Sequence, residues 1–246
     1  MEFDYPDIVL LGLDLRSRNC RTGDEGDDIA LRIKINKDGP YLVSGRVPLS
    51  SQTIDIDSNG HSCGWQEDGQ YPDEERYSLC RCGMSKNKPF CDGKHTRVNF
   101  DGTETAKRES YLKTAKRIEG PTVDLTDARE FCAAARFCDR AGGIWKLVSQ
   151  SDKPEARKLA EDEARNCPSG RLVLWDKNGK TIEPKFEPSI VVVEDPQENM
   201  EGPLWVRGYI PIESADGYVY ERRNRVALCR CGKSSNKPFC DGSHCE

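Results

Sequence analysis

The sequence has little of what a large core, a membrane anchor or a nucleic-acid binder requires. Hydrophobic residues make up 36% of the 246 positions, and the mean hydropathy is -0.74. No apolar run approaches the roughly eighteen residues that span a bilayer, and the start, MEFDYPDIVLLGL, lacks the features of a signal peptide. The formal charge of -5 comes from interspersed acidic and basic residues. We therefore expect several small units in a cytoplasmic protein that binds neither membranes nor nucleic acid.

Familiar enzyme motifs are also missing. The sequence contains no phosphate-binding loop, no nucleotide fingerprint and no nucleophile–base pairing. Histidine is scarce, with three residues, whereas cysteine is abundant, with twelve. In a reducing compartment, clustered thiolates are more often metal or redox ligands than disulfides. We therefore expect ligand chemistry and no catalysis by the chain itself.

One ligand pattern occurs twice. LCRCGMSKNKPFCDGKH (79–95) and LCRCGKSSNKPFCDGSH (228–244) share the spacing C-x-C-x8-C-x3-H. A C-x-C pair can reach one centre only if the backbone curls, which the following glycine permits. The third cysteine and the histidine are one helical turn apart and share a face. The pattern predicts a metal centre in each copy, with the ligands Cys80, Cys82, Cys91 and His95 in the first and Cys229, Cys231, Cys240 and His244 in the second.

The repeat extends upstream of the cysteines. GPYLVSGRVPL (39–49) and GPLWVRGYIPI (202–212) precede the two ligand patterns, and we interpret each as a strand. The first copy carries about fourteen extra residues within Ser50–Arg76, which we expect to form a surface loop. The chain therefore contains a duplicated module.

The segment between the copies has a different pattern. An acidic start, Glu130 and the stop at Gly142-Gly143 predict a helix over 127–139. A proline at the first position and apolar residues on one face predict a second helix over 154–166. RLVLWD and SIVVVED predict a strand pair around the turn KNGK.

The spacing of the repeated ligands leaves two kinds of centre open. Structural zinc usually takes cysteine pairs separated by two to four residues, so a C-x-C pair with one downstream histidine fits it imperfectly. A two-iron cluster fits better, because it spreads four ligands over two metals.

The two copies resemble the CDGSH iron–sulfur, or NEET, proteins, whose signature is C-x-C-x2-S-x3-P-x-C-D-G-S-H. The second copy matches throughout, and the first has Lys94 where the family has a small residue. The resemblance implies one [2Fe-2S] cluster per motif, with one iron on the C-x-C pair and the other on the third cysteine and the histidine. It also implies that two β-rich modules pair as a pseudo-dimer within one monomeric chain.

The middle cysteines follow a ferredoxin pattern. FCAAARFC and NCPSG place Cys132, Cys138 and Cys167-Pro168 on the bacterial C-x2-C-x2-C…C-P pattern, with Ala135 at the second ligand position. The segment resembles the divergent single-cluster ferredoxin-like domain found fused to CDGSH motifs. Three thiolates favour [3Fe-4S], or [4Fe-4S] with one non-cysteine ligand. The alternative is that these cysteines are small buried residues, although a separation of six does not match one face of a helix.

We therefore expect an α+β chain of three parts: an N-terminal segment with the first CDGSH module (1–119), a ferredoxin-like domain (120–196) and the second CDGSH module (197–246). The expected function is electron transfer between a reductase and an acceptor protein. The alternatives are donation of iron or clusters to an apo-acceptor, combined with redox sensing, and a zinc-stabilised interaction module. We expect the cysteines outside every pattern to be bystanders: Cys20, Cys63 and Cys245.

Overall fold

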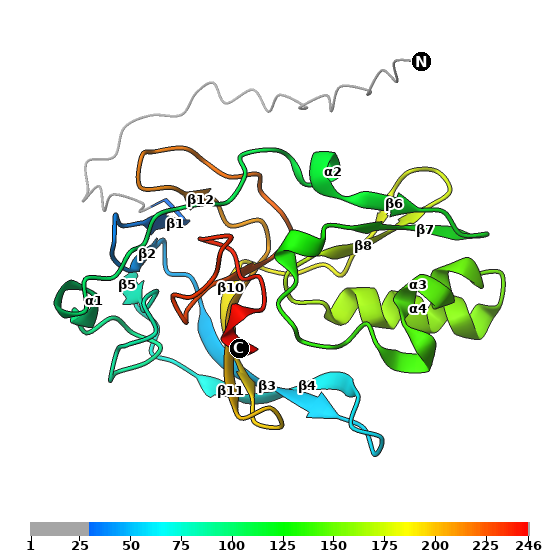
Figure 1. Cartoon of the computed structure of the whole chain (residues 1–246), viewed down its shortest axis with the longest axis horizontal. Helices are drawn as coiled ribbons and strands as arrows, with labels where there is room; N and C mark the ends of the chain where they lie inside the picture. Colours follow the sequence, from blue (N-terminus) through cyan, green and yellow to red (C-terminus); the bar gives the residue numbers. More distant parts are fainter. Residues whose placement is uncertain (1–29, 246) are drawn as a thin grey trace, which may run out of the picture.

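The computed structural model describes residues 30–245. This part of the chain is mixed α+β, with three sheets and a few short helices (Figure 1). None of its helices has the length and apolar character needed to cross a membrane. Cys20 lies outside the described residues.

Two of the sheets each combine strands from both copies. Their strand orders are β12-β1-β2-β5 and β13-β11-β10-β3-β4. β12 follows the second copy's strand β11 and yet pairs in parallel with β1, while β3 follows the first copy's strand β2 and pairs in parallel with β10. The strands are β1 (Arg32–Ile35), β2 (Tyr41–Ser44), β3 (Leu49–Ile56), β4 (Ser62–Gln70), β5 (Arg76–Leu79), β10 (Ser189–Asp195), β11 (Met200–Arg207), β12 (Ile212–Glu213) and β13 (Arg225–Leu228).

The exchange of strands is reciprocal. Tyr41 pairs with Leu79 across β2 and β5, and the equivalent residues Leu204 and Leu228 pair across β11 and β13. Each copy also gives one strand to the sheet of the other, β3 in one direction and β12 in the other. A pseudo-twofold axis therefore relates the two copies, which confirms the predicted intramolecular pseudo-dimer.

The strand β10 is buried on both faces. Ile190 and Val192 belong to the main core between the two shared sheets, whereas Val191 and Val193 pack with Trp205 on the other face. A strand covered on both faces has a continuous apolar sequence, here IVVV. The predicted pairing of SIVVVED with RLVLWD is wrong, because β10 pairs with β11 and β3.

The third sheet belongs to the middle of the chain. Its order is β6-β7-β8-β9, and it shares a core with α3 and α4 (Figure 1). The predicted helix over 154–166 is confirmed as α4, in which Ala160 and Ala164 face the core. The elements of this region are β6 (Lys116–Ile118), β7 (Val123–Asp127), the 3-10 turn η2 (Arg140–Gly142), α3 (Ile144–Ser149), α4 (Pro154–Asn166), β8 (Leu172–Asp176) and β9 (Thr181–Ile182). The other α-helices among the described residues are α1 (Lys94–Arg97) and α2 (Tyr111–Thr114).

Two other sequence predictions are wrong. The predicted helix over 127–139 is a winding loop with only one 3-10 turn, η1 (Arg129–Phe131), because Ala134 and Arg136 adopt left-handed φ angles of 53° and 58°. The predicted surface loop within Ser50–Arg76 is largely the hairpin β3–β4. Trp65 on this hairpin packs against Phe137 of the winding loop, with ring centroids 4.8 Å apart, so the hairpin helps to cover the middle region.

Candidate metal centres

The first motif gathers its four predicted ligands in two pairs. The Sγ atoms of Cys80 and Cys82 lie 3.8 Å apart, and Cys91 Sγ lies 3.3 Å from His95 Nδ1. The fold of the loop explains these pairs, because Gly83 curls the chain after the C-x-C segment with φ 75°. The Cys91–His95 pair spans the turn at the start of α1.

The second motif repeats this geometry. Cys229 Sγ and Cys231 Sγ lie 3.6 Å apart, and Cys240 Sγ lies 3.4 Å from His244 Nδ1. Each motif also closes on itself through equivalent backbone hydrogen bonds, since the amide of Cys80 or Cys229 donates to the proline carbonyl nine residues on, at 2.8 or 2.9 Å. The sequence repeat is therefore also a repeat of ligand geometry.

The environment of the second motif favours the metal-binding forms of Cys231 and His244. The hydrogen bond between the paired thiols lowers the pKa of Cys231 to about 6 and raises that of Cys229, so the pair gives up its first proton readily. Burial and the positive charge of Arg230 lower the pKa of His244, which favours the neutral imidazole that binds metals. The carboxylate of Asp241 accepts a hydrogen bond from the Ser243 amide at 3.1 Å and so holds the turn that carries His244.

A buried arginine braces each C-x-C loop from within. Arg81 is 1% exposed and donates through Nε to the carbonyl of Gly39 at 2.8 Å. Arg230 is 5% exposed and donates to the equivalent carbonyl, that of Gly202, at 2.5 Å. These arginines join the ligand loop of each copy to the glycine that opens its repeated segment, GPYLVSGRVPL or GPLWVRGYIPI.

The two C-x-C loops touch each other across the pseudo-twofold axis. A methyl group on Gly83 would come within 2.5 Å of the carbonyl oxygen of Cys231, and one on Gly232 within 2.8 Å of that of Cys82. Tyr41 of the first copy also donates its hydroxyl to the Cys229 carbonyl at 2.7 Å. Glycine is therefore required at both positions for the close approach of the two motifs.

The three middle cysteines line one cavity. Cys132, Cys138 and Cys167 all contribute to its wall. Ala135, at the second ligand position of the ferredoxin pattern, lines the same cavity. The winding loop brings Cys132 and Cys138 to one cavity although six residues separate them, and burial raises the pKa of Cys138 well above its usual range.

Arg171 is a site residue that the sequence reasoning missed. Its Nη1 donates to Cys132 Sγ at 3.1 Å, and its Nε and Nη2 donate to the two carboxylate oxygens of Asp127 at 2.6 and 2.9 Å. The pair holds a fixed cation against one of the predicted ligands. The only sequence signal was its place directly after the CPSG run.

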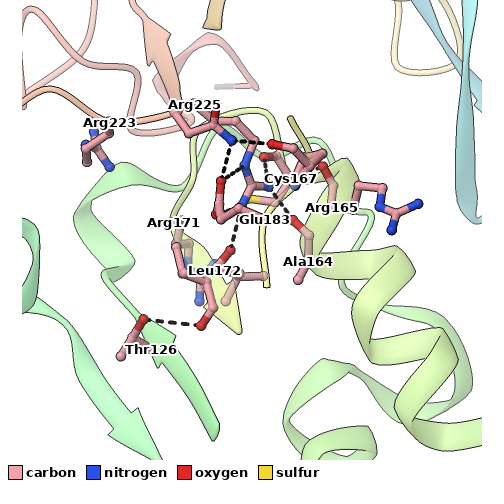
Figure 2. A network of polar contacts seen from close by, with 12 residues as sticks. Thr126, Ala164, Arg165, Cys167, Arg171, Leu172, Glu183, Arg223 and Arg225 are labelled. Carbon is pink, nitrogen blue, oxygen red and sulfur yellow. Dashed lines mark hydrogen bonds and ion pairs between the residues drawn. The ribbon is translucent and has the colours of Figure 1, made fainter. Parts of the chain in front are cut away.

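Arg225 was also missed, and it holds the segment that carries Cys167. Its guanidinium is 1% exposed, donates to the carbonyl of Cys167 at 2.8 Å and forms a close ion pair with Glu183 (Figure 2). The same group donates to the carbonyl of Ala164 at the end of α4. Arg225 therefore bonds strand β13 to the ferredoxin-like region between the two copies, which we call the middle domain. The residue that follows β13 is Cys229.

Two of the expected bystander cysteines can be placed. Cys63 lies on β4 and Cys245 in the last turn, η3 (Ser243–Cys245), and both are half-buried free thiols. Neither belongs to the described residues that line the cavity of the three middle cysteines.

Comparison with models of protein families gives two matches. Residues 38–96 and 201–245 match the family described as iron-binding zinc finger, CDGSH type. Residues 118–177 match the family described as divergent 4Fe-4S mono-cluster. No curated protein and no solved structure gave a match. Both resemblances noted in the sequence are confirmed, with two CDGSH regions flanking a ferredoxin-like region.

Proposed function

We propose that this chain, an iron–sulfur protein in which two CDGSH-type regions flank a divergent mono-cluster region, transfers electrons through three clusters. The observation that carries the proposal is the gathering of the eight CDGSH ligands into four close pairs. The three cysteines that line one cavity support a third cluster in the middle of the chain.

The paired ligands fit a [2Fe-2S] cluster. Such a cluster takes two protein ligands on each iron, which are here a Cys–Cys pair and a Cys–His pair in each motif. A single zinc ion instead needs three or four ligands around one point. Among residues 30–245, no three His, Cys, Asp or Glu side chains form such a group. The paired ligands of each motif therefore favour a binuclear centre over a single zinc ion.

The cavity fits a cluster with three thiolate ligands. Cys132, Cys138 and Cys167 supply them, and Ala135, which occupies the second ligand position of the ferredoxin pattern, lines the same cavity. This set favours [3Fe-4S], while [4Fe-4S] requires a ligand of another kind on one iron. The N–H group of Arg171 on Cys132 Sγ offsets the negative charge of a thiolate-bound cluster.

The clusters, when bound, supply the capacity to accept and release single electrons. The chain holds each [2Fe-2S] cluster through one neutral histidine in place of a fourth thiolate, which makes the cluster less negative and easier to reduce. Burial of Cys80, Cys82, Cys229 and Cys240 keeps water from the thiolates. The partners we propose are a reductase and an acceptor protein, each exchanging one electron at a time, and the chemistry of substrates belongs to those partners.

Cluster donation is a second candidate, and the exposure of one pair favours it. Cys91 is half-buried, whereas its equivalent Cys240 is 2% exposed, and His95 and His244 are both half-buried. The first copy would therefore be the donor.

Redox cycling in the presence of an apo-ferredoxin separates the two functions. Electron transfer predicts reversible reduction over repeated cycles, with the iron retained on this chain and none on the apo-protein. Transfer of iron and sulfide to the apo-ferredoxin faster than the reduction cycle would favour donation and contradict our proposal.

A further inference from the structure

We propose that the second CDGSH site, and not the first, exchanges electrons directly with the middle site. The middle site is the cavity of Cys132, Cys138 and Cys167, and the first and second sites are the ligand sets of the two CDGSH motifs. The inference rests on the function proposed above and adds the order in which the sites exchange electrons, which is middle site, second site, first site. It concerns two motifs of nearly identical sequence, so the difference comes from what surrounds them.

The second motif and the middle cavity share a wall. Cys240 packs with Ala133 and Ala227 in one buried cluster, and Ala133 follows the predicted ligand Cys132 and lines the cavity. A methyl group on Gly242 would lie 3.3 Å from the Cys132 carbonyl oxygen. One ligand segment of the second motif therefore lies directly on one ligand segment of the middle site.

Specific contacts fix this wall in place. The side-chain amide of Asn236 donates to the Glu130 carbonyl at 2.8 Å. Phe131 and Phe239 meet edge to face with centroids 5.2 Å apart, and the Arg223 guanidinium lies 4.1 Å from the centroid of Phe131. Arg225 also donates a hydrogen bond to the Cys167 carbonyl. β13 and the second motif therefore contact both segments that supply the middle cysteines.

The first motif contacts other residues than the second motif does. Phe90, the equivalent of Phe239, packs edge to face on Tyr71 and Tyr77 of its own copy, with centroids 5.6 and 6.3 Å apart. The equivalent of Asn236 is Asn87, which is exposed. The first motif meets the second through Gly83, which lies against Cys231. In Figure 1 the C-terminal segment lies between α1 and β5 of the first copy on one side and α3 and α4 of the middle of the chain on the other.

Each exchange moves one electron between neighbouring sites, so one site is oxidised and the next reduced by one unit, and no bond forms or breaks. The electron comes from a one-electron carrier protein and leaves to another. Because transfer rates fall steeply with distance, two sites that share a wall exchange faster than two sites that do not.

Magnetic coupling between clusters measures this order without any activity assay. Cys80→Ser with Cys82→Ser leaves the second [2Fe-2S] cluster, and Cys229→Ser with Cys231→Ser leaves the first. Each protein is reduced with dithionite, and the spin relaxation of its [2Fe-2S] EPR signal is compared with and without Cys138→Ser, which removes a middle ligand. We expect loss of the relaxation enhancement for the second cluster and no change for the first. Equal changes in both, or a change only in the first, would overturn the order.

A matched pair tests the wall with all ligands present. Asn236→Ala removes the hydrogen bond to the winding loop, and Asn87→Ala is the same change in the first copy. We expect weaker coupling only for Asn236→Ala, with iron content unchanged in both, and equal effects would contradict the inference. Iron analysis separates this from the proposed function, because Cys138→Ser should remove about three or four irons. An unchanged iron content would refute the middle cluster and, with it, the proposed order of electron exchange.

Discussion

The two CDGSH copies have the same ligand spacing and the same strand register, but equivalent positions have different neighbours. Arg76 begins β5 in the first copy and is exposed, whereas its equivalent, Arg225, begins β13 and is 1% exposed within the middle domain. Cys91 is half-buried, whereas Cys240 lies against Ala133. The repeat thus determines how each motif gathers its predicted ligands, and the middle domain, docked on the second copy, makes the two motifs unequal.

The largest expected difference between the copies is at the two equivalent arginines. Arg225→Ala leaves the Glu183 carboxylate and the carbonyls of Cys167 and Ala164 without their cation, and breaking a buried pair in this way costs about 3–5 kcal/mol. Arg76→Ala, at an exposed position, should change the free energy of unfolding by less than about 0.5 kcal/mol. Urea unfolding of the cluster-loaded proteins measures both, and similar costs would contradict the asymmetry.

The contact between the copies can be broken at Gly83. Gly83→Ala adds backbone strain at φ 75° and a clash with the Cys231 carbonyl, which together should cost about 2–4 kcal/mol. Gly93→Ala is the control, because Gly93 has φ 80° and open space around it, so only strain of about 1 kcal/mol remains. Thermal unfolding of both variants distinguishes a true contact, which predicts a lower midpoint for Gly83→Ala, from strain alone, which predicts equal midpoints.

Exchange of the histidine ligands tests what the copies share. His244→Cys and His95→Cys each replace a neutral ligand with a thiolate, so each should lower the potential of its own cluster, by on the order of 100 mV. The change should also slow the loss of that cluster in acid, because a thiolate ligand resists protonation more than an imidazole. Redox titration followed by EPR measures the potentials, and unchanged values would remove that histidine from the ligand set.

The smallest expected effect is a pH dependence of stability in the middle domain, which Arg225 contacts. Glu163 on α4 is fully buried, and burial raises its pKa to about 8, although Arg140 lies 3.7 Å away and acts in the opposite direction. Since the unfolded chain releases this proton near pH 4.3, the free energy of unfolding should fall as the pH rises from about 4.5 to 8. Glu163→Gln removes that loss and should stabilise the protein by about 1–2 kcal/mol at pH 8 and little at pH 5. Unfolding at both pH values tests this, and a pH-independent effect would contradict it.

The predictable part of the molecule was the part with a short-range pattern. The duplicated module and α4 followed from repetition and helical periodicity, and the pseudo-dimer was implied by the resemblance to the CDGSH proteins. The ligands predicted from their spacing lie in close pairs. The winding loop over 127–139 was mistaken for a helix, because nothing local in CAAARFC indicates left-handed residues at Ala134 and Arg136. The roles of Arg171 and Arg225 also remained hidden, since both depend on contacts between distant segments, and Arg225 has the same residue type as its exposed equivalent Arg76.

The most direct test of the central claim is iron, sulfide and zinc analysis of the anaerobically purified chain, with EPR of the oxidised and dithionite-reduced protein. Three clusters predict about seven irons per chain, or eight if the middle cluster is [4Fe-4S], and a reduced [2Fe-2S] signal. A [3Fe-4S] centre in the middle adds a signal in the oxidised protein. About four irons would restrict the clusters to the CDGSH motifs, and a colourless protein with stoichiometric zinc would contradict the account.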